Sequence, residues 1–195
     1  MPTARLEAFS DGVIAILITI MVLELRVPHG ASYSELRELL PVFLAYVLSF
    51  VNLGIYWNNH HHMLFATERV TGKILWANLH LLFWLSLFPF ATGWMGENDF
   101  ARLPVAVYGL VSLLAAIAYY VLQTVIVAGH GPDSKLATAL GNDLKGKISP
   151  ILYVAGVAFA YTARWVSLAL YVFVALMWLV PDRRIERLVD NDVTT

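Results

Sequence analysis

Six long apolar segments constrain this chain more than any other feature of its sequence. A helix that crosses the roughly 30 Å hydrocarbon core of a bilayer needs about 20 mostly apolar residues, at about 1.5 Å per residue. Segments near this length cover residues 3–25, 36–57, 74–95, 103–128, 147–161 and 165–180. Lipid offers the backbone no hydrogen-bond partner, so each segment is predicted to be a helix. The sequence therefore predicts an all-α membrane protein with six transmembrane helices.

Composition agrees with a chain that lies mostly in lipid. Apolar residues make up 59% and charged residues 14%, against about 45–50% and about 25% in soluble domains. We expect one transmembrane domain over residues 1–182 and a short cytoplasmic tail over 183–195. The absence of cysteine excludes disulfides and thiolate metal sites, and a net charge of -1 gives no reason to expect a nucleic-acid partner. No small-residue cleavage signal follows the first segment, so we expect it to be retained.

The distribution of Lys and Arg predicts the orientation. With the N-terminus in the cytoplasm, the inner loops and tail carry nine of these residues and the outer loops carry four. This excess supports cytoplasmic positions for both termini and an even number of spans. We expect a multi-pass protein of the cell membrane.

Polar residues make the first apolar segment unusual. Its uninterrupted apolar stretch, residues 13–23 with one Thr, covers roughly 16 Å at 1.5 Å per residue, about half of the hydrocarbon thickness. Ser10, Asp11 and Glu24 bracket it. An ionisable group within a span is costly and normally faces the interior of a bundle or water. We therefore expect this helix to lie inside the protein or at the centre of an oligomer.

A helical projection places a stripe of small and aliphatic side chains on one face of this segment. The stripe consists of Gly12, Ile16, Thr19, Ile20 and Leu23. Ser10 and Asp11 point well away from it. In one interpretation the stripe is an ordinary packing surface and Asp11 is a structural anchor. In the other, the stripe faces a narrow pore and gates it by dewetting, as hydrophobic constrictions can.

The same residues form a specific motif. The first segment contains Arg5-x-x-x-Phe9-Ser10-Asp11-Gly12-Val13-x-Ala15-Ile16-x-x-Thr19, followed by Leu23-Glu24-Leu25. This pattern resembles that of the transmembrane protein 175 family of potassium channels, and of its prokaryotic members. Supporting motifs are Tyr56-Trp57 with His60-His61-His62, Trp76-x-Asn78, Pro89-Phe90, Ser149-Pro150 and Trp178-x-x-Pro181.

The resemblance implies a homotetramer of six-helix subunits with the first helix around a central pore. It implies a potassium-permeable cation channel, with modest preference over sodium and without the Thr-Val-Gly-Tyr-Gly filter, which this chain also lacks. It also implies a constriction at Ile16, further hydrophobic layers at Ile20 and Leu23, and a pore-facing Thr19, which we take as an ion-site candidate. No cofactor is expected. The expected partners are the bilayer, further copies of the chain, and potassium and other monovalent cations as permeant species.

Arg5, Phe9, Ser10 and Asp11 are assigned to the scaffold of the first helix. Asp11 and Arg5 are six residues apart, about 9 Å along the helix and on different sides, so they cannot easily pair. The partners of Asp11 should lie on other helices. Candidates are Trp76, Asn78 and His80, together with the histidines after residue 57.

Other polar residues leave alternatives open. Consecutive histidines on a helix point about 100° apart, so His60, His61 and His62 are not expected to bind one metal ion, and their role is open. Glu24 could concentrate cations or pair with Arg26 or Arg37. For Asn52 and Gln123, hydrogen bonds between helices are expected.

Three other classes of function compete with the channel. The first is a proton-coupled secondary transporter that uses Asp11 or a histidine as proton carrier. The second is a membrane enzyme, which we do not expect because no catalytic motif is present. The third is an accessory membrane subunit.

Overall fold

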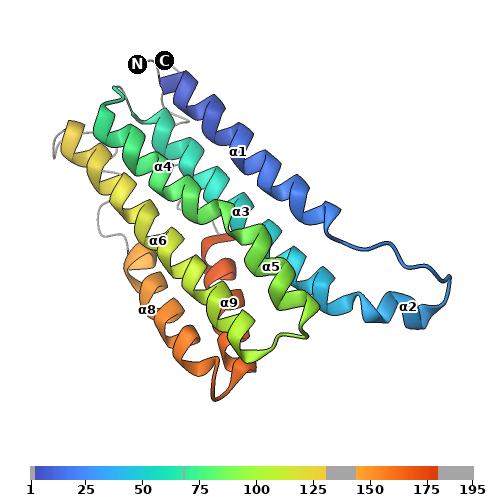
Figure 1. The fold of residues 1–195 in the computed structure, drawn as a ribbon. Helices are drawn as coiled ribbons and strands as arrows, with labels where there is room; N and C mark the ends of the chain where they lie inside the picture. The colour runs from blue at the N-terminus through green and yellow to red at the C-terminus, as the bar shows by residue number, and fades with distance from the viewer. Residues whose placement is uncertain (1–2, 68, 131–143, 180–195) are drawn as a thin grey trace.

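The computed structural model describes residues 3–67, 69–130 and 144–179, and in these residues every regular element is a helix (Figure 1). The helices are α1 (Thr3–Leu23), α2 (Tyr33–Glu38), α3 (Leu40–Phe65), α4 (Gly72–Ser86), α5 (Phe88–Glu97), α6 (Arg102–His130), α8 (Leu144–Phe159) and α9 (Arg164–Leu179). The predicted all-α fold is confirmed. The predicted tail, 183–195, lies outside the described residues.

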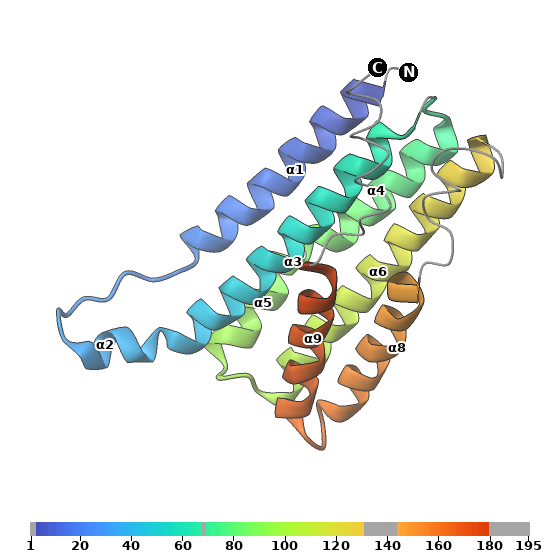
Figure 2. The same cartoon turned by 180° about the vertical axis from the view of Figure 1, so that it is seen from behind.

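The long helices run up and down in an antiparallel bundle (Figures 1 and 2). Helix α1 lies along one edge and contacts α3, α4 and α5, whereas α8 and α9 lie on the other side against α6 and α3. Helices α4 and α5 follow one another in the middle of the bundle, and half of their most apolar stretch is buried. This arrangement leaves much of the surface of α1 uncovered by its own subunit.

Four stretches are long and apolar enough to cross a bilayer: Thr3–Leu23, Leu40–Phe65, Gly72–Glu97 and Arg102–His130. Helices α8 and α9 have 16 residues each, which is roughly 24 Å and short of the roughly 30 Å of hydrocarbon. The structure therefore agrees with a membrane protein of at least four spans among the described residues. Six spans stay a prediction.

Helix boundaries follow local chemistry and refine the predicted segments. Pro41 stands at the start of α3 and Pro89 at the start of α5. Proline has no N–H to donate and its ring crowds the preceding turn, so it interrupts a helix that would otherwise continue. The segment predicted over 36–57 accordingly divides at Leu39, and that over 74–95 divides at Leu87. The Thr71 side chain accepts from the Ile74 N–H at 3.4 Å and caps α4.

Tyr171 joins α9 to α6 and α8. Its side chain is fully buried, and its hydroxyl donates to the Val105 carbonyl at 3.3 Å. The ring lies against Gly109 of α6 and Gly156 of α8, where a Cβ atom would overlap it. Small residues allow helices in membranes to approach closely. These two glycines therefore create the space that the tyrosine ring fills.

Asn52 connects α3 to α6. Its amide donates to the Tyr108 hydroxyl at 3.0 Å, and Ser49 donates to the same hydroxyl at 3.2 Å. All three side chains are buried. The expected hydrogen bond between helices is therefore confirmed for Asn52. For Gln123 no hydrogen bond is found among the described residues, where its side chain lines a pocket, so that expectation stays a prediction.

Candidate pore face of helix α1

One face of α1 is uncovered within the subunit. Ile16 is 57% exposed, Ile20 40% and Leu23 82%, and Gly12 and Thr19 are exposed beside them. Phe9 and Val22 are also exposed, so exposure alone does not single out the stripe. An apolar face of this extent needs lipid or another protein surface to cover it. The pore roles of Ile16, Thr19, Ile20 and Leu23 stay predictions.

Thr19 is the polar member of the stripe. Its hydroxyl donates to the Ile16 carbonyl at 2.9 Å, within the same helix. A hydroxyl that has used its proton still carries lone pairs that can accept or coordinate. The Thr19 oxygen therefore keeps the capacity to face a cation or water.

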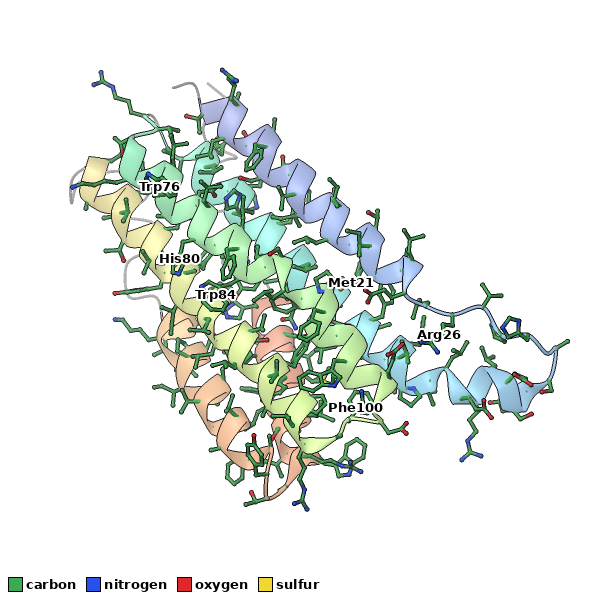
Figure 3. All side chains as sticks on the ribbon, in the orientation of Figure 1. Met21, Arg26, Trp76, His80, Trp84 and Phe100 are labelled. Carbon is green, nitrogen blue, oxygen red and sulfur yellow. The ribbon has the colours of Figure 1, made fainter. Side chains whose placement is uncertain are left out.

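The opposite face of α1 packs into the bundle. Its buried residues are Leu6, Ser10, Ile14, Leu17 and Met21. They recur at spacings of three and four, which place them on one side of a helix. Met21 lies at the end of this face, where α1 meets α5 (Figure 3). The sequence prediction that Ser10 points away from the stripe is confirmed.

Ser10 forms the centre of a buried hydrogen-bond chain across three helices. Its hydroxyl donates to the Leu6 carbonyl at 2.9 Å and accepts from the Asn78 amide of α4, also at 2.9 Å. The Asn78 carbonyl oxygen lies 2.7 Å from Nε2 of His60, on α3. Ser10, Asn78 and His60 are each fully buried. These hydrogen bonds therefore connect α1 to α4, and α4 to α3, at the same depth in the bundle.

The same series of hydrogen bonds also determines the tautomer of His60. The Ser10 proton is directed to a carbonyl, so Asn78 presents its NH2 group to Ser10 and its oxygen to the histidine. A carbonyl oxygen only accepts, so Nε2 of His60 carries the proton. The buried Nδ1 atom has no hydrogen-bond partner within the described residues. His60 is therefore a donor in the scaffold.

Asp11 has a different partner from those predicted. The Trp57 indole N–H on α3 donates to its Oδ1 atom at 3.0 Å. Asp11 is rotated by about 100° from Ser10, toward α3 rather than α4, which separates it from the α4 candidates. Asn78 bonds Ser10 instead. The candidate list of Trp76, Asn78 and His80 omitted Trp57.

The two other candidates lie on the outer side of α4. Figure 3 shows Trp76, His80 and Trp84 one turn apart along this helix. Trp76 is 75% exposed, and the Trp84 indole donates to Nε2 of His80 at 2.9 Å. These side chains therefore belong to the surface of the subunit and not to the attachment of α1.

A second contact between α1 and α3 lies beside Asp11. The Nδ1 atom of His61 is 2.6 Å from Oε1 of Glu7, and its ring stacks on Trp57 with centroids 6.2 Å apart. Arg5 and Phe9, the other motif residues, are exposed. Their scaffold role stays a prediction.

The three histidines do not converge. His60 faces Asn78, His61 faces Glu7, and the ring of His62 lies edge-on to His61. Across the described ranges, no three His, Asp or Glu side chains are placed to hold a metal ion. His60 and His61 thus make polar contacts between helices, whereas the contact shown for His62 is with its neighbour on α3.

Charged residues after the C-terminal end of α1 pair differently from the prediction. Arg26 binds Glu97 of α5 at 3.0 Å, with both side chains exposed. Among the described residues Glu24 forms no ion pair, so pairing with Arg26 or Arg37 is wrong there. Partial burial, and then the nearby Glu97 carboxylate, raise the pKa of Glu24 above its ordinary value.

Trp57 and the burial of His60 were missed by sequence reasoning. A usable signal was their spacing, because residues 57, 60 and 61 lie within one helical turn and share a side of α3. What the sequence lacks is the rotation of α1 about its axis relative to α3. That rotation decides which side chain reaches Asp11.

Fold and site together define an all-helical membrane protein whose first helix is held by polar contacts on one face and left uncovered on the other. The family described as "Endosomal/lysosomal potassium channel TMEM175" matches residues 5–89. A potassium channel from Chryseobacterium sp. (strain P1-3) is 54% identical over 187 residues, covering 96% of this chain and 97% of that protein. The chain belongs to the TMEM175 family.

More distant relatives extend the likeness. A potassium channel from Streptomyces collinus is 30% identical over 90% of this chain and 91% of its own length. The human endosomal/lysosomal proton channel TMEM175 is 32% identical over 51% of this chain, which is 22% of that protein. The crystal structure of a lysosomal potassium-selective channel TMEM175 homolog from Chamaesiphon minutus matches with a TM-score of 0.81 at 29% identity, over 92% of this chain and 97% of that one.

Proposed function

We propose that this protein is a potassium-permeable cation channel that passes ions down their gradient. The observation that carries the proposal is the uncovered apolar stripe of α1, in a chain 54% identical to a bacterial protein named as a potassium channel. The proposed assembly is a homotetramer of six-helix subunits in a prokaryotic cell membrane. Both termini face the cytoplasm, and α1 of each subunit lines the pore.

The proposed barrier is a ring of Ile16 side chains. Such a ring offers a cation no ligand, and a narrow apolar neck expels water, so the closed neck blocks ions. Ile20 and Leu23 add further apolar layers one and two turns outward. Opening widens the neck enough for a largely hydrated ion. Selectivity is then weaker than in a filter built of backbone carbonyls.

Thr19 supplies the polar contact in this proposal. It lies on the same face one turn from Ile16, and its hydroxyl oxygen keeps free lone pairs. Four such oxygens replace part of an ion's hydration shell as it passes. Glu24, without an ion-pair partner among the described residues, adds negative charge where α1 ends. Both features favour cations over anions.

Planar-bilayer recording of the purified protein under potassium and sodium gradients tests the proposal. Potassium current without a coupled ion is expected. Ile16→Asn replaces the apolar neck with an amide that water wets, so conductance should rise severalfold. Unchanged current in this variant would remove Ile16 from the pore.

Val22→Asn is the matched control for this experiment. Val22 is also exposed on α1, but six residues separate it from Ile16, which is a rotation of about 120° away. The Val22→Asn variant places the same amide group on the same helix, but outside the proposed neck. Wild-type conductance is expected in Val22→Asn.

A second candidate, proton movement, is favoured by the names of the vertebrate relatives, which are endosomal/lysosomal proton channels. In this chain the proton-carrier candidates are Asp11 and the histidines after Trp57. Asp11 accepts a hydrogen bond from the Trp57 indole N–H, so its carboxylate is engaged in a contact between helices. Recording with a pH gradient and symmetric potassium separates the two: a reversal potential that follows the pH gradient indicates proton permeation.

A further inference from the structure

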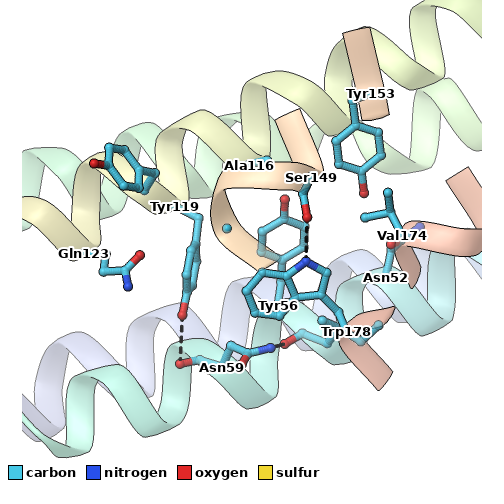
Figure 4. Close-up of a pocket in the computed structure, with 13 residues that line it drawn as sticks. Asn52, Tyr56, Asn59, Ala116, Tyr119, Gln123, Ser149, Tyr153, Val174 and Trp178 are labelled. Atoms are coloured by element: carbon cyan, nitrogen blue, oxygen red, sulfur yellow. Dashed lines mark hydrogen bonds between the residues drawn. The ribbon is translucent and has the colours of Figure 1, made fainter. Parts of the chain in front are cut away.

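A pocket lies inside the subunit between α3, α6, α8 and α9 (Figure 4). Its volume is about 50 Å³, and none of its described lining residues comes from α1. The polar lining groups on which the inference rests are Tyr56, Gln123 and Tyr153. The pocket is therefore a compartment separate from the proposed pore.

Several polar groups in the wall of the pocket have no protein partner. Gln123 is 6% exposed and Tyr153 4%. Among the described residues no hydrogen bond is found for either side chain or for the Tyr56 hydroxyl, and all three side chains line the pocket. Buried polar groups are bonded in the great majority of cases, to protein or to water. These three groups need a partner that the surrounding helices do not supply.

Other polar groups in the wall are already satisfied. The Tyr119 hydroxyl donates to the Asn59 carbonyl at 3.3 Å, and the Trp178 indole donates to Ser149 at 2.8 Å (Figure 4). The wall therefore combines polar groups that bond other helices with polar groups that face the pocket without such a bond.

The pocket reaches the end of α8 that carries charge. Gly146 lines it and stands between Lys145 and Lys147. Lysine ammonium groups do not remain within hydrocarbon but extend to the aqueous boundary. The wall of the pocket thus runs from the polar groups around Gln123 to a helix end that carries two lysines.

We propose that this pocket is a hydrated chamber in each subunit, open to the aqueous phase near the start of α8. Its volume suits about one or two water molecules, since each occupies roughly 30 Å³ in the liquid. It is far smaller than the roughly 300–1,000 Å³ of typical ligand sites, so we take water as the proposed occupant. The waters donate to and accept from Gln123, Tyr56 and Tyr153. The inference does not depend on the proposed channel function.

Silver-ion labelling of single cysteines tests the chamber, because the natural chain has no cysteine. Ag⁺ is small and binds thiolates, which form in water and not in apolar surroundings. Gln123→Cys and Ala116→Cys, both in the wall, are expected to bind Ag⁺ at least about tenfold faster than buried sites. Native mass spectrometry of the full-length protein counts the bound ions.

The controls lie on the same helix. Leu122→Cys replaces a fully buried side chain outside the pocket, and Ile117→Cys replaces one that is exposed on the apolar outer surface. Both control variants are expected to bind Ag⁺ slowly. The wild-type protein, which has no cysteine, measures how much Ag⁺ binds to methionine. The proposal is overturned if Gln123→Cys and Ala116→Cys bind Ag⁺ no faster than the two control variants. Ala116→Cys carries the test if Gln123→Cys does not fold.

A filling variant locates the reactive space. Ala116→Val adds two methyl groups to the wall of the pocket. Combined with Gln123→Cys, it is expected to displace the water and reduce the rate of silver binding toward that of Leu122→Cys. An undiminished rate would show that Ag⁺ reaches residue 123 by another route and would contradict the chamber.

Discussion

Helix α1 and the cluster around Tyr171 are attached to the bundle by different forces. Tyr171 fills space between glycines of α6 and α8, so shape complementarity holds this region together. Helix α1 buries one narrow face and is fixed by the hydrogen bonds of Ser10 and Asp11. Close packing is rigid, because even one added methyl group is felt. A few directional bonds define a position with less buried surface.

This difference suits the two regions to different roles. A pore-lining helix has to move when a constriction opens, and hydrogen bonds between membrane helices contribute only about 0.6 kcal/mol each on average. The region of α6, α8 and α9 can instead act as a fixed support. Mutations around Tyr171 should therefore change stability, and mutations around Ser10 should change conductance.

The largest expected effect is that of Gly109→Ala. The new methyl group would overlap the Tyr171 hydroxyl, and overpacking a tight site costs about 3 kcal/mol at the upper end of its usual range. Thermal unfolding in detergent measures the loss. Channels that remain folded should conduct normally, because the overlap lies away from α1.

Two variants control this prediction. Gly129→Ala adds the same methyl group at a position of α6 with open space around it, and should leave the melting temperature unchanged or slightly raised. Gly109→Ala with Tyr171→Phe removes the nearest overlapping atom and should recover part of the stability. No recovery would place the damage elsewhere than at Tyr171.

The next effect concerns Asn78→Ala, which removes both bonds that this amide makes. Ser10 loses its donor and His60 loses its acceptor, at a total cost of about 1 kcal/mol if each bond contributes the average of about 0.6 kcal/mol. Helix α1 should then be displaced more easily, and single-channel recording should show altered open probability. A loss of stability with wild-type gating would contradict the proposed division between the two regions.

Hydropathy predicted the helices because burial in lipid depends on segment length and composition. The outward stripe of α1 followed from helical periodicity, which is equally local. The partners of Asp11 and Tyr171 depend on how the helices rotate and cross. Nothing in the sequence around Gly109 and Gly156 indicates that the Tyr171 ring packs against both glycines. The divisions at Leu39 and Leu87 were within reach, because a proline follows each by two residues.

A smaller effect is expected for Trp57→Phe, which keeps an aromatic ring and removes the N–H that binds Asp11. The loss in stability should be about 0.6 kcal/mol. Asp11→Ala should damage assembly or gating more, because Trp57 then loses its acceptor. In a double-mutant cycle, Trp57→Phe and Asp11→Ala should change conductance less in combination than the sum of their separate effects, because both remove the same hydrogen bond. Normal assembly and conduction in Asp11→Ala would contradict the scaffold role.

The smallest expected effect lies at the C-terminal end of α1, where Glu24 is near Glu97 of α5. Burial and Glu97 raise the pKa of Glu24, so Glu24 takes up a proton at a higher pH than an ordinary glutamate. Folding therefore disfavours the carboxylate form of Glu24 relative to the protonated form. Stability therefore rises slightly as the pH falls through this raised pKa, because the folded state binds more protons there.

Conductance should change in the opposite direction at this site. Protonation removes a negative charge from the mouth, so cation current at low salt should decrease modestly as the pH falls, and high salt should screen the effect. Glu24→Gln should abolish this step, and Glu97→Gln should move it to lower pH because one cause of the raised pKa is gone. A step that persists unchanged in Glu24→Gln would assign the titration to another group.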